Sequence, residues 1–192
     1  MKVKEVIKLA AFYLQLEGVI SRGELADSYN GGIIDDGTPE AAALDRLLRC
    51  CNLVYGEIAS EYYPPEAAQV FTTSDGVIQN GSFAKSLIDV KRVEDADGRA
   101  LKFKAYSSHI KTESGKVTVR YTYLPASLSL GGALEFGDKI SARVIAYGAA
   151  SEYCVISAMF DEALMWEKRF RDSLAAAVRK KSEIRIPARK WR

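Results

Sequence analysis

The chain is poor in the residues on which most catalytic and metal sites depend. Its 192 residues include a single histidine, His109, and three cysteines. One histidine leaves one candidate for a histidine-based triad and no histidine-rich metal site. The cysteines, Cys50, Cys51 and Cys154, are odd in number and lack a CxxC spacing, so they provide no disulfide framework. All three lie in apolar helical contexts, which suits free, buried thiols in a reducing cytoplasm.

Several catalytic motifs are missing as well. The chain has no GxxxxGK[ST], GxGxxG or GxSxG, so phosphate cradling and serine-hydrolase geometry lack support. The acidic stretch 95–98 has no further acidic ligand or closing glutamate for a calcium loop, and a hairpin turn explains it better. Asp35 and Asp36 fit an exposed turn, and His109 fits a surface loop. An enzyme acting through these three residues is the least favoured class, and we expect no cofactor and no metal.

Proline is absent from residues 139–181, where Gly148 is the one glycine. A single straight helix over this segment would be roughly 60 Å long, which exceeds the width of a small domain. We therefore expect a bend, a break near 157–161, or a role in a larger assembly. Trp166 and Phe170, one turn apart, are expected in the core. A mainly apolar stripe recurs at helical spacing throughout the segment, at Ile140, Val144, Tyr147, Ser151, Val155, Met159, Ala163, Trp166, Phe170, Leu174 and Ala177.

Part of this segment, residues 140–160, has the length of a membrane span. Glu152 would then lie near the bilayer centre, at a cost of a few kcal/mol. A helix buried by protein is the better interpretation, and no membrane partner is expected. The N-terminus does not resemble a signal peptide, because Lys8 and Gln15 interrupt its apolar run.

Two helices are predicted at the N-terminal end. The first runs from about residue 2 to residue 16, with Gly18 as a natural C-cap. The second has Thr38 at the N-cap and Pro39 at the first helical position. It continues until prolines 64 and 65 end it.

Residues 69–123 have the composition of strands. Val117, Val119, Tyr121 and Tyr123 alternate with polar residues, which is the period of a half-buried strand. Residues 101–105 alternate in the same way, and glycine-containing turns separate the segments. The fold class predicted is therefore α+β, a mainly helical body with an inserted small antiparallel β unit. The expected boundaries are 1–68 for the N-terminal helices, 69–124 for the β unit, 125–181 for a long C-terminal helical segment packing on those helices, and 182–192 for a basic extended tail.

The net charge of +2 hides an asymmetry between body and tail. Residues 179–192 carry a net charge of +6, and residues 1–178 carry −4. Such a tail suits an acidic partner, although a solvated end explains the charge equally well. Extended peptides dock on protein surfaces, and basic peptides with a tryptophan also bind nucleic acid. The candidate partner-binding residues are Ile184, Arg185, Ile186, Arg189, Lys190 and Trp191.

The predicted C-terminal helix also has a run of small residues, from Gly148 to Ser151. Small side chains allow helices to approach closely, and side-by-side packing with rotational closure produces rings. Gly148, Ala149 and Ser151 are therefore candidate subunit-packing residues.

Five segments resemble the head–tail adaptor proteins of tailed bacteriophages and prophages. They are YTYLP at 121–125, IAYGAASEY at 145–153, FDEA at 160–163, WEKRF at 166–170 and LLRCCNLVYGEIASEYYP at 47–64. In that family a strand ending in an aromatic–proline step precedes a small-residue helix, an acidic–alanine step, and a tryptophan with a basic–aromatic pair. The resemblance covers essentially the whole chain, but its motifs are loose and structural.

The resemblance implies a structural protein of the virion and no enzymatic activity. Such adaptors form homo-oligomeric rings, commonly of twelve copies, that dock on the portal protein and receive a tail protein. The free protein can be monomeric in the host cytoplasm until the portal templates the ring, which would touch nucleic acid only by enclosing DNA in a channel. The C-terminal tail would engage the portal. The alternative from the residues themselves is a nucleic-acid-binding accessory protein that uses the same tail.

Overall fold

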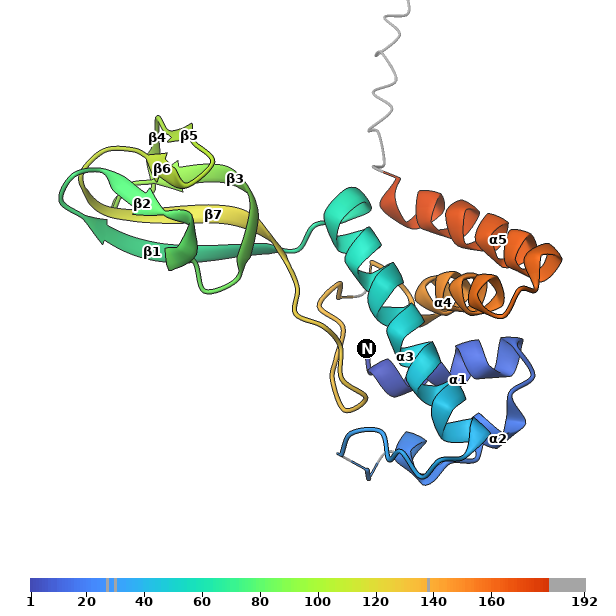
Figure 1. Cartoon of the computed structure of the whole chain (residues 1–192). Coiled ribbons are helices and arrows are strands. Elements are labelled where there is room, and N and C mark those ends of the chain that lie inside the picture. Colours follow the sequence, from blue (N-terminus) through green and yellow to red (C-terminus); the bar gives the residue numbers. More distant parts are fainter. Residues whose placement is uncertain (27, 30, 138, 180–192) are drawn as a thin grey trace, which may run out of the picture.

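The chain folds into a helical body and a separate β unit, joined by two chain segments (Figure 1). The computed structural model describes residues 1–26, 28–29, 31–137 and 139–179. The fold is α+β, as predicted, with small antiparallel sheets. The helices are α1 (Val3–Tyr13), α2 (Glu17–Ile20), η1 (Gly23–Leu25), α3 (Pro39–Glu57), η2 (Ile58–Tyr62), η3 (Asn80–Ser82), α4 (Ala142–Ile156) and α5 (Phe160–Val178). The strands are β1 (Glu66–Thr73), β2 (Val77–Gln79), β3 (Ser86–Glu94), β4 (Ala100–Leu101), β5 (Lys104–Ala105), β6 (His109–Lys111) and β7 (Gly115–Leu124).

The first helix ends earlier than expected. It stops at Tyr13, and Gly18 lies inside α2, so the prediction of Gly18 as its C-cap is wrong. Gln15 takes the left-handed conformation with φ of 57°. The amides of Gln15 and Leu16 donate to the carbonyls of Phe12 and Ala11. This is the pair of bonds with which a glycine usually ends a helix, here made by glutamine.

The same device divides the long C-terminal segment into α4 and α5. Ala158 has φ of 58°, and the amides of Ala158 and Met159 donate to the carbonyls of Val155 and Cys154. The predicted break near 157–161 is confirmed. Because the chain reverses there, α4 and α5 lie against each other and the segment stays within the width of the body (Figure 1).

Helix α3 begins as the sequence predicts. Thr38 is the N-cap, and its Oγ1 accepts a hydrogen bond of 3.2 Å from the amide of Ala41. Pro39 occupies the first helical position, where no amide donor is needed. At the other end the helix widens into the π-helical turn η2, and the Tyr63 amide donates to the Ile58 carbonyl at 2.7 Å.

The β unit consists of two antiparallel sheets with a shared core. The strand order is β1-β7-β3-β4 in the first sheet and β2-β6-β5 in the second. Strand β1 begins at Glu66, three residues before the expected start of the unit. Residues 101–105, expected as one strand, are divided between β4 and β5, which belong to different sheets. The buried core is formed by Ile78, Phe83, Val90, Val93, Ile110, Val117, Val119, Tyr121 and Tyr123.

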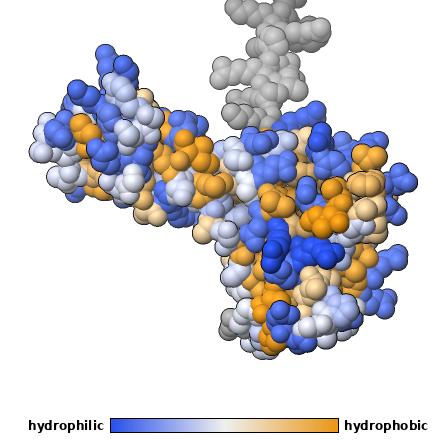
Figure 2. Space-filling view, in the orientation of Figure 1, coloured by the Kyte–Doolittle hydropathy of each residue, from blue (hydrophilic) through white to orange (hydrophobic). Residues whose placement is uncertain are grey.

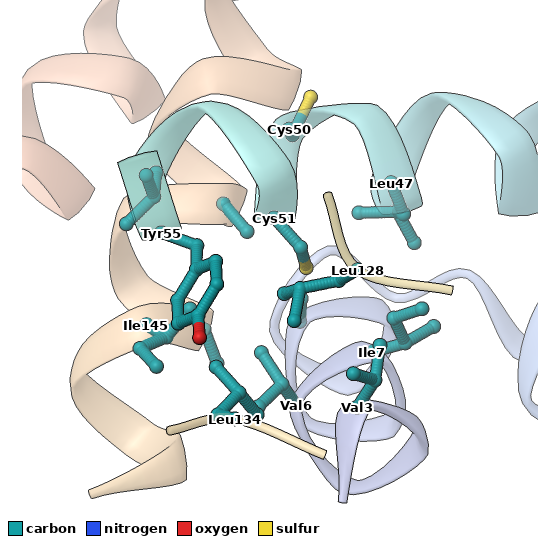
Figure 3. Close-up of a cluster of buried hydrophobic side chains, with 14 of the residues drawn as sticks. Val3, Val6, Ile7, Leu47, Cys50, Cys51, Tyr55, Leu128, Leu134 and Ile145 are labelled. Carbon is teal, nitrogen blue, oxygen red and sulfur yellow. The ribbon is translucent and has the colours of Figure 1, made fainter. Parts of the chain in front are cut away.

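Helix α4 lies at the centre of the helical body, in contact with α1, α3 and α5. Figure 3 shows Ile7 of α1, Leu47 and Tyr55 of α3 and Ile145 of α4 converging in one apolar cluster. The connection from β7 to α4 also contributes, with Leu128, Leu130, Leu134 and Phe136 buried in the same cluster. This segment is therefore part of the core and not a simple linker.

The aromatic pair of α5 is buried, as expected. Trp166 is 7% and Phe170 2% exposed. The indole ring stacks on Tyr13 of α1 and Tyr147 of α4, with centroids 5.1 and 5.7 Å away. Cys50, Cys51 and Cys154 are free and buried. Burial raises the pKa of the Cys50 thiol to about 11.

Candidate interaction surfaces

The predicted partner-binding residues of the tail, Ile184, Arg185, Ile186, Arg189, Lys190 and Trp191, lie outside the described residues. The structure describes the chain as far as Arg179, just after the end of α5. Helix α5 ends at Val178, and its C-terminal half lies beside the end of α3, where Glu57 and Arg171 interact electrostatically. In Figure 1 the C-terminal end of α5 lies close to the point where η2 leads into the β unit.

The predicted subunit-packing residues are buried within a single chain. Gly148 lies where a Cβ atom would come within 2.7 Å of Val54 on α3 and 3.2 Å of Phe170 on α5. Ala149 is fully buried, and the Ser151 hydroxyl donates to the Ala163 carbonyl at 3.0 Å. These residues allow α4 to pack between its neighbours, so they are not accessible to a second subunit. The assignment is corrected accordingly.

An exposed apolar surface lies instead where α4 turns into α5. We call it the α4–α5 tip. Leu164 is 70% and Phe160 64% exposed, on one face of α5. The tip consists of Val155, Ile156, Met159, Phe160, Leu164 and Met165, all large, apolar and exposed. Six such side chains within eleven residues are unusual for a surface in water, and such patches mark contact sites for proteins. The tip lies at the end of the helical body away from the β unit (Figure 1).

The expected apolar stripe did not reveal this tip. Val155 and Met159 fit the stripe in the sequence, but they flank the reversal at Ala158 that ends α4, and both are exposed there. A signal was present in α5 itself. Phe160 and Leu164 do not lie on the same helical face as Ala163, Trp166 and Phe170, so the α5 sequence is apolar on two faces. A surface helix buries only one face against the core, so the second apolar face is left exposed.

A groove adjoins the tip. It has a volume of about 610 Å³ and runs between Ile156 and the first turns of α3. Asp45 and Arg49 on its wall form an ion pair of 2.7 Å. The Arg46 guanidinium lies 5.7 Å from the centroid of the Tyr153 ring. The tip is thus bordered by a polar, charge-balanced wall. Hydrophobic and hydrophilic side chains are mixed in this way over the viewed face of the helical body (Figure 2).

A polar cluster connects the β unit to the helical body. The Lys85 ammonium donates to the Tyr123 hydroxyl at 2.6 Å and to the Glu135 carboxylate at 2.9 Å, and the Tyr123 hydroxyl donates to the same carboxylate. The Glu135 amide donates to the Tyr55 hydroxyl of α3 at 3.1 Å. The hydrogen bonds from Tyr123 and then Lys85 lower the pKa of Glu135, so the carboxylate stays ionised.

The residues considered for catalysis or for a calcium site have structural partners. Asp36 accepts hydrogen bonds from Thr38 and pairs with Arg22 at 3.1 Å. The Asp95 carboxylate accepts from the amides of Asp97 and Arg99, which closes a hairpin turn. His109 contacts the Ser108 hydroxyl at 3.1 Å and stacks on Tyr106. Among the described residues, no three His, Cys, Asp or Glu side chains cluster closely enough to hold a metal ion.

Comparison with family models and with curated protein sequences gives no relative. No family model matches the chain, and no curated protein matches it in sequence. A separate check of hydropathy concerns the described residues. Within them, no helix combines the length and the apolar character needed to cross a membrane.

Proposed function

We propose that this chain is a ring-forming head–tail adaptor of a tailed bacteriophage or prophage. In this role it is a structural protein of the virion, made in the host cytoplasm. It docks on the portal protein through its basic C-terminal tail and presents its other end to a tail protein. The proposal starts from the sequence resemblance and draws support from the shape and surface of the molecule.

The α4–α5 tip is the observation that carries the proposal. A ring needs a heterologous contact, in which one surface of a subunit meets a different surface of the next. The six exposed apolar side chains of the tip supply one such surface at one end of the helical body. The β unit projects from the other end (Figure 1), so it stays clear of a contact made through the tip. We therefore assign subunit packing to the tip, in place of Gly148, Ala149 and Ser151.

The first experiment measures mass. The mass of the purified protein is measured alone and after mixing with the portal protein of the same phage or prophage. We expect a portal complex that contains a ring of the protein, commonly of twelve copies, whether or not the free protein is monomeric. A protein that stays unbound in the presence of the portal contradicts the proposal.

Two variants separate ring closure from portal attachment. The double variant Phe160→Asp with Leu164→Asp removes the apolar contact and should bind the portal without completing a ring. Val70→Asp is the matched control, because Val70 is 54% exposed on β1, away from the tip. Deleting residues 182–192 should abolish portal attachment and leave the fold intact. A deleted protein that still joins the portal at full strength would refute the assignment of the tail.

A further inference from the structure

The second sheet of the β unit has one buried and one exposed face. Ile78 and Ile110 lie opposite each other in the register and are buried, at 3% and 1% exposure, against the first sheet. Side chains alternate along a strand, so their neighbours in β2 and β6 point to the other face. That outer face carries Gln79, His109 and Lys111, together with Lys104 from β5. Hydrophilic residues predominate on the viewed side of the β unit (Figure 2).

Two lysines on this face lie directly opposite each other. Lys104 of β5 pairs in register with Lys111 of β6, which places their Cβ atoms about 5 Å apart. Like charges in this position destabilise a sheet. Both side chains are exposed, as is that of Lys102 just before β5. In the described part of the chain, no ion pair is found for any of these three lysines.

An aromatic pair borders the lysines. The Lys104 ammonium lies 5.1 Å from the centroid of the Tyr106 ring, and Tyr106 is 41% exposed. Tyr106 in turn stacks on His109, with centroids 4.6 Å apart and planes 15° apart. None of the residues in β2, β5 and β6 is acidic. We call Lys102, Lys104, Lys111, Tyr106 and His109 the basic sheet face.

We propose that the basic sheet face binds the phosphate backbone of nucleic acid, with duplex DNA as its ligand. A polyanion would relieve the repulsion between Lys104 and Lys111 without requiring any change in the sheet. Lysine ammonium groups are compact charges on flexible stems, and basic side chains that neutralise backbone phosphates release counterions and bind DNA without reading its sequence. The inference does not rest on the adaptor function or on the tail, because it concerns other residues.

The test measures the affinity of the full-length protein for a 20-base-pair duplex by fluorescence anisotropy between 50 and 200 mM salt. The slope of log K against log salt is negative, and each lost phosphate contact reduces its magnitude by about 0.9. Lys104→Gln with Lys111→Gln should therefore make the slope less negative by about 1.8. At 50 mM salt the affinity should fall on the order of 100-fold. Replacing both lysines by arginine should preserve binding, since the cations are kept.

Two controls isolate the site. Lys8→Gln with Lys168→Gln removes the same charge from exposed positions on α1 and α5 and should leave affinity within about threefold of the parent. Circular dichroism melts check folding, and loss of the Lys104–Lys111 repulsion should not lower the melting temperature. Replacing Arg185, Arg189 and Lys190 by glutamine measures any contribution of the tail.

Three outcomes would overturn the proposal. The first is a wild-type protein with no measurable DNA affinity at 50 mM salt. The second is an unchanged affinity and salt slope in the sheet variant, with binding lost in the tail variant. The third is binding of polyglutamate in preference to DNA through the same two lysines, which would make the face a site for an acidic protein.

Discussion

At the scale of single residues, Asp36 joins the loop before α3 to the start of that helix. Its carboxylate accepts hydrogen bonds from the Thr38 amide at 3.1 Å and the Thr38 hydroxyl at 2.6 Å. Arg22, which also binds Glu24 and Thr38, approaches from the preceding segment. These bonds to Thr38 and then to Arg22 lower the pKa of Asp36 to about 2. One aspartate thus stabilises the N-cap that the sequence identified.

The pKa of Asp36 makes the stability of the fold depend on pH. The folded pKa lies below the unfolded value of 3.8, so the stabilisation is complete above about pH 4 and is lost as the pH falls toward 2. Asp36→Asn should lower the free energy of unfolding at pH 6 and by progressively less between pH 4 and pH 2. Urea denaturation across this range measures the difference. If the difference in unfolding free energy between Asp36→Asn and the parent stays constant with pH, the pKa of Asp36 is the same in the folded and unfolded states, which contradicts the prediction.

Trp166 links three helices of the body. Its indole lies between Tyr13 and Tyr147, so it joins α1, α4 and α5. Trp166→Ala should lower the free energy of unfolding by about 3–5 kcal/mol through lost burial and the cavity left behind. Leu164→Ala, on the exposed side of the same helix, is the control and should change stability by less than about 1 kcal/mol. A Trp166 variant that melts within a degree or two of the parent contradicts the packing described.

At the scale of elements, two helices end at residues that are not glycine. Gln15 and Ala158 both occupy the left-handed conformation, which costs an L-residue roughly 1–2 kcal/mol. Ala158→Gly should relieve this strain and raise the free energy of unfolding by about 0.5–1 kcal/mol, after the greater entropy of glycine in the unfolded chain. Ala142→Gly, at the start of α4, has no strain to relieve and should destabilise. Denaturant titrations of the pair test both signs.

Gly148 and Gly56 are both helical glycines, and they should respond in opposite directions to alanine. A Cβ at Gly148 would meet the Val54 side chain at 2.7 Å, and Val54 is 1% exposed and has no room to move. Gly148→Ala should therefore destabilise by about 1–3 kcal/mol. No heavy atom lies within 4 Å of a Cβ at Gly56. Gly56→Ala should stabilise by about 0.5–1 kcal/mol through helix propensity. Equal effects would contradict the packing of α4 against α3.

Local signals predicted the elements, and long-range contacts decided the rest. Thr38 and Pro39 predict the start of α3 from adjacent residues, because the cap bond is made within the first turn. The alternation from Val117 to Tyr123 likewise predicts the buried face of β7. The two unusual helix ends were missed because glutamine and alanine seldom adopt a positive φ. The interior position of Gly148 was missed for another reason. A small residue in a helix indicates close packing, but the sequence does not say whether the neighbour is the same chain or a second copy.

At the scale of the whole molecule, the β unit is attached to the helical body by two chain segments and by the cluster of Lys85, Tyr123 and Glu135. The ion pair in this cluster is about 40% exposed on both sides, so its effect on global stability is small. Its location matters more than its strength. It spans the two units, with Tyr123 on β7 and Glu135 in the connection to α4. We infer that it fixes the angle between them.

The last prediction tests this role by measuring distances between the units. Glu135→Ala should leave the melting temperature within a few degrees of the parent but broaden the distances between spin labels on cysteines introduced at Ser74 in the β unit and Lys8 in α1. Buried Cys50 has a raised pKa of about 11, and Cys51 and Cys154 are also buried with raised pKa, so these thiols should resist labelling. Glu113→Ala, an exposed carboxylate of the β unit, is the control. A distance distribution as narrow in the Glu135 variant as in the control would leave the two chain segments alone to set the angle.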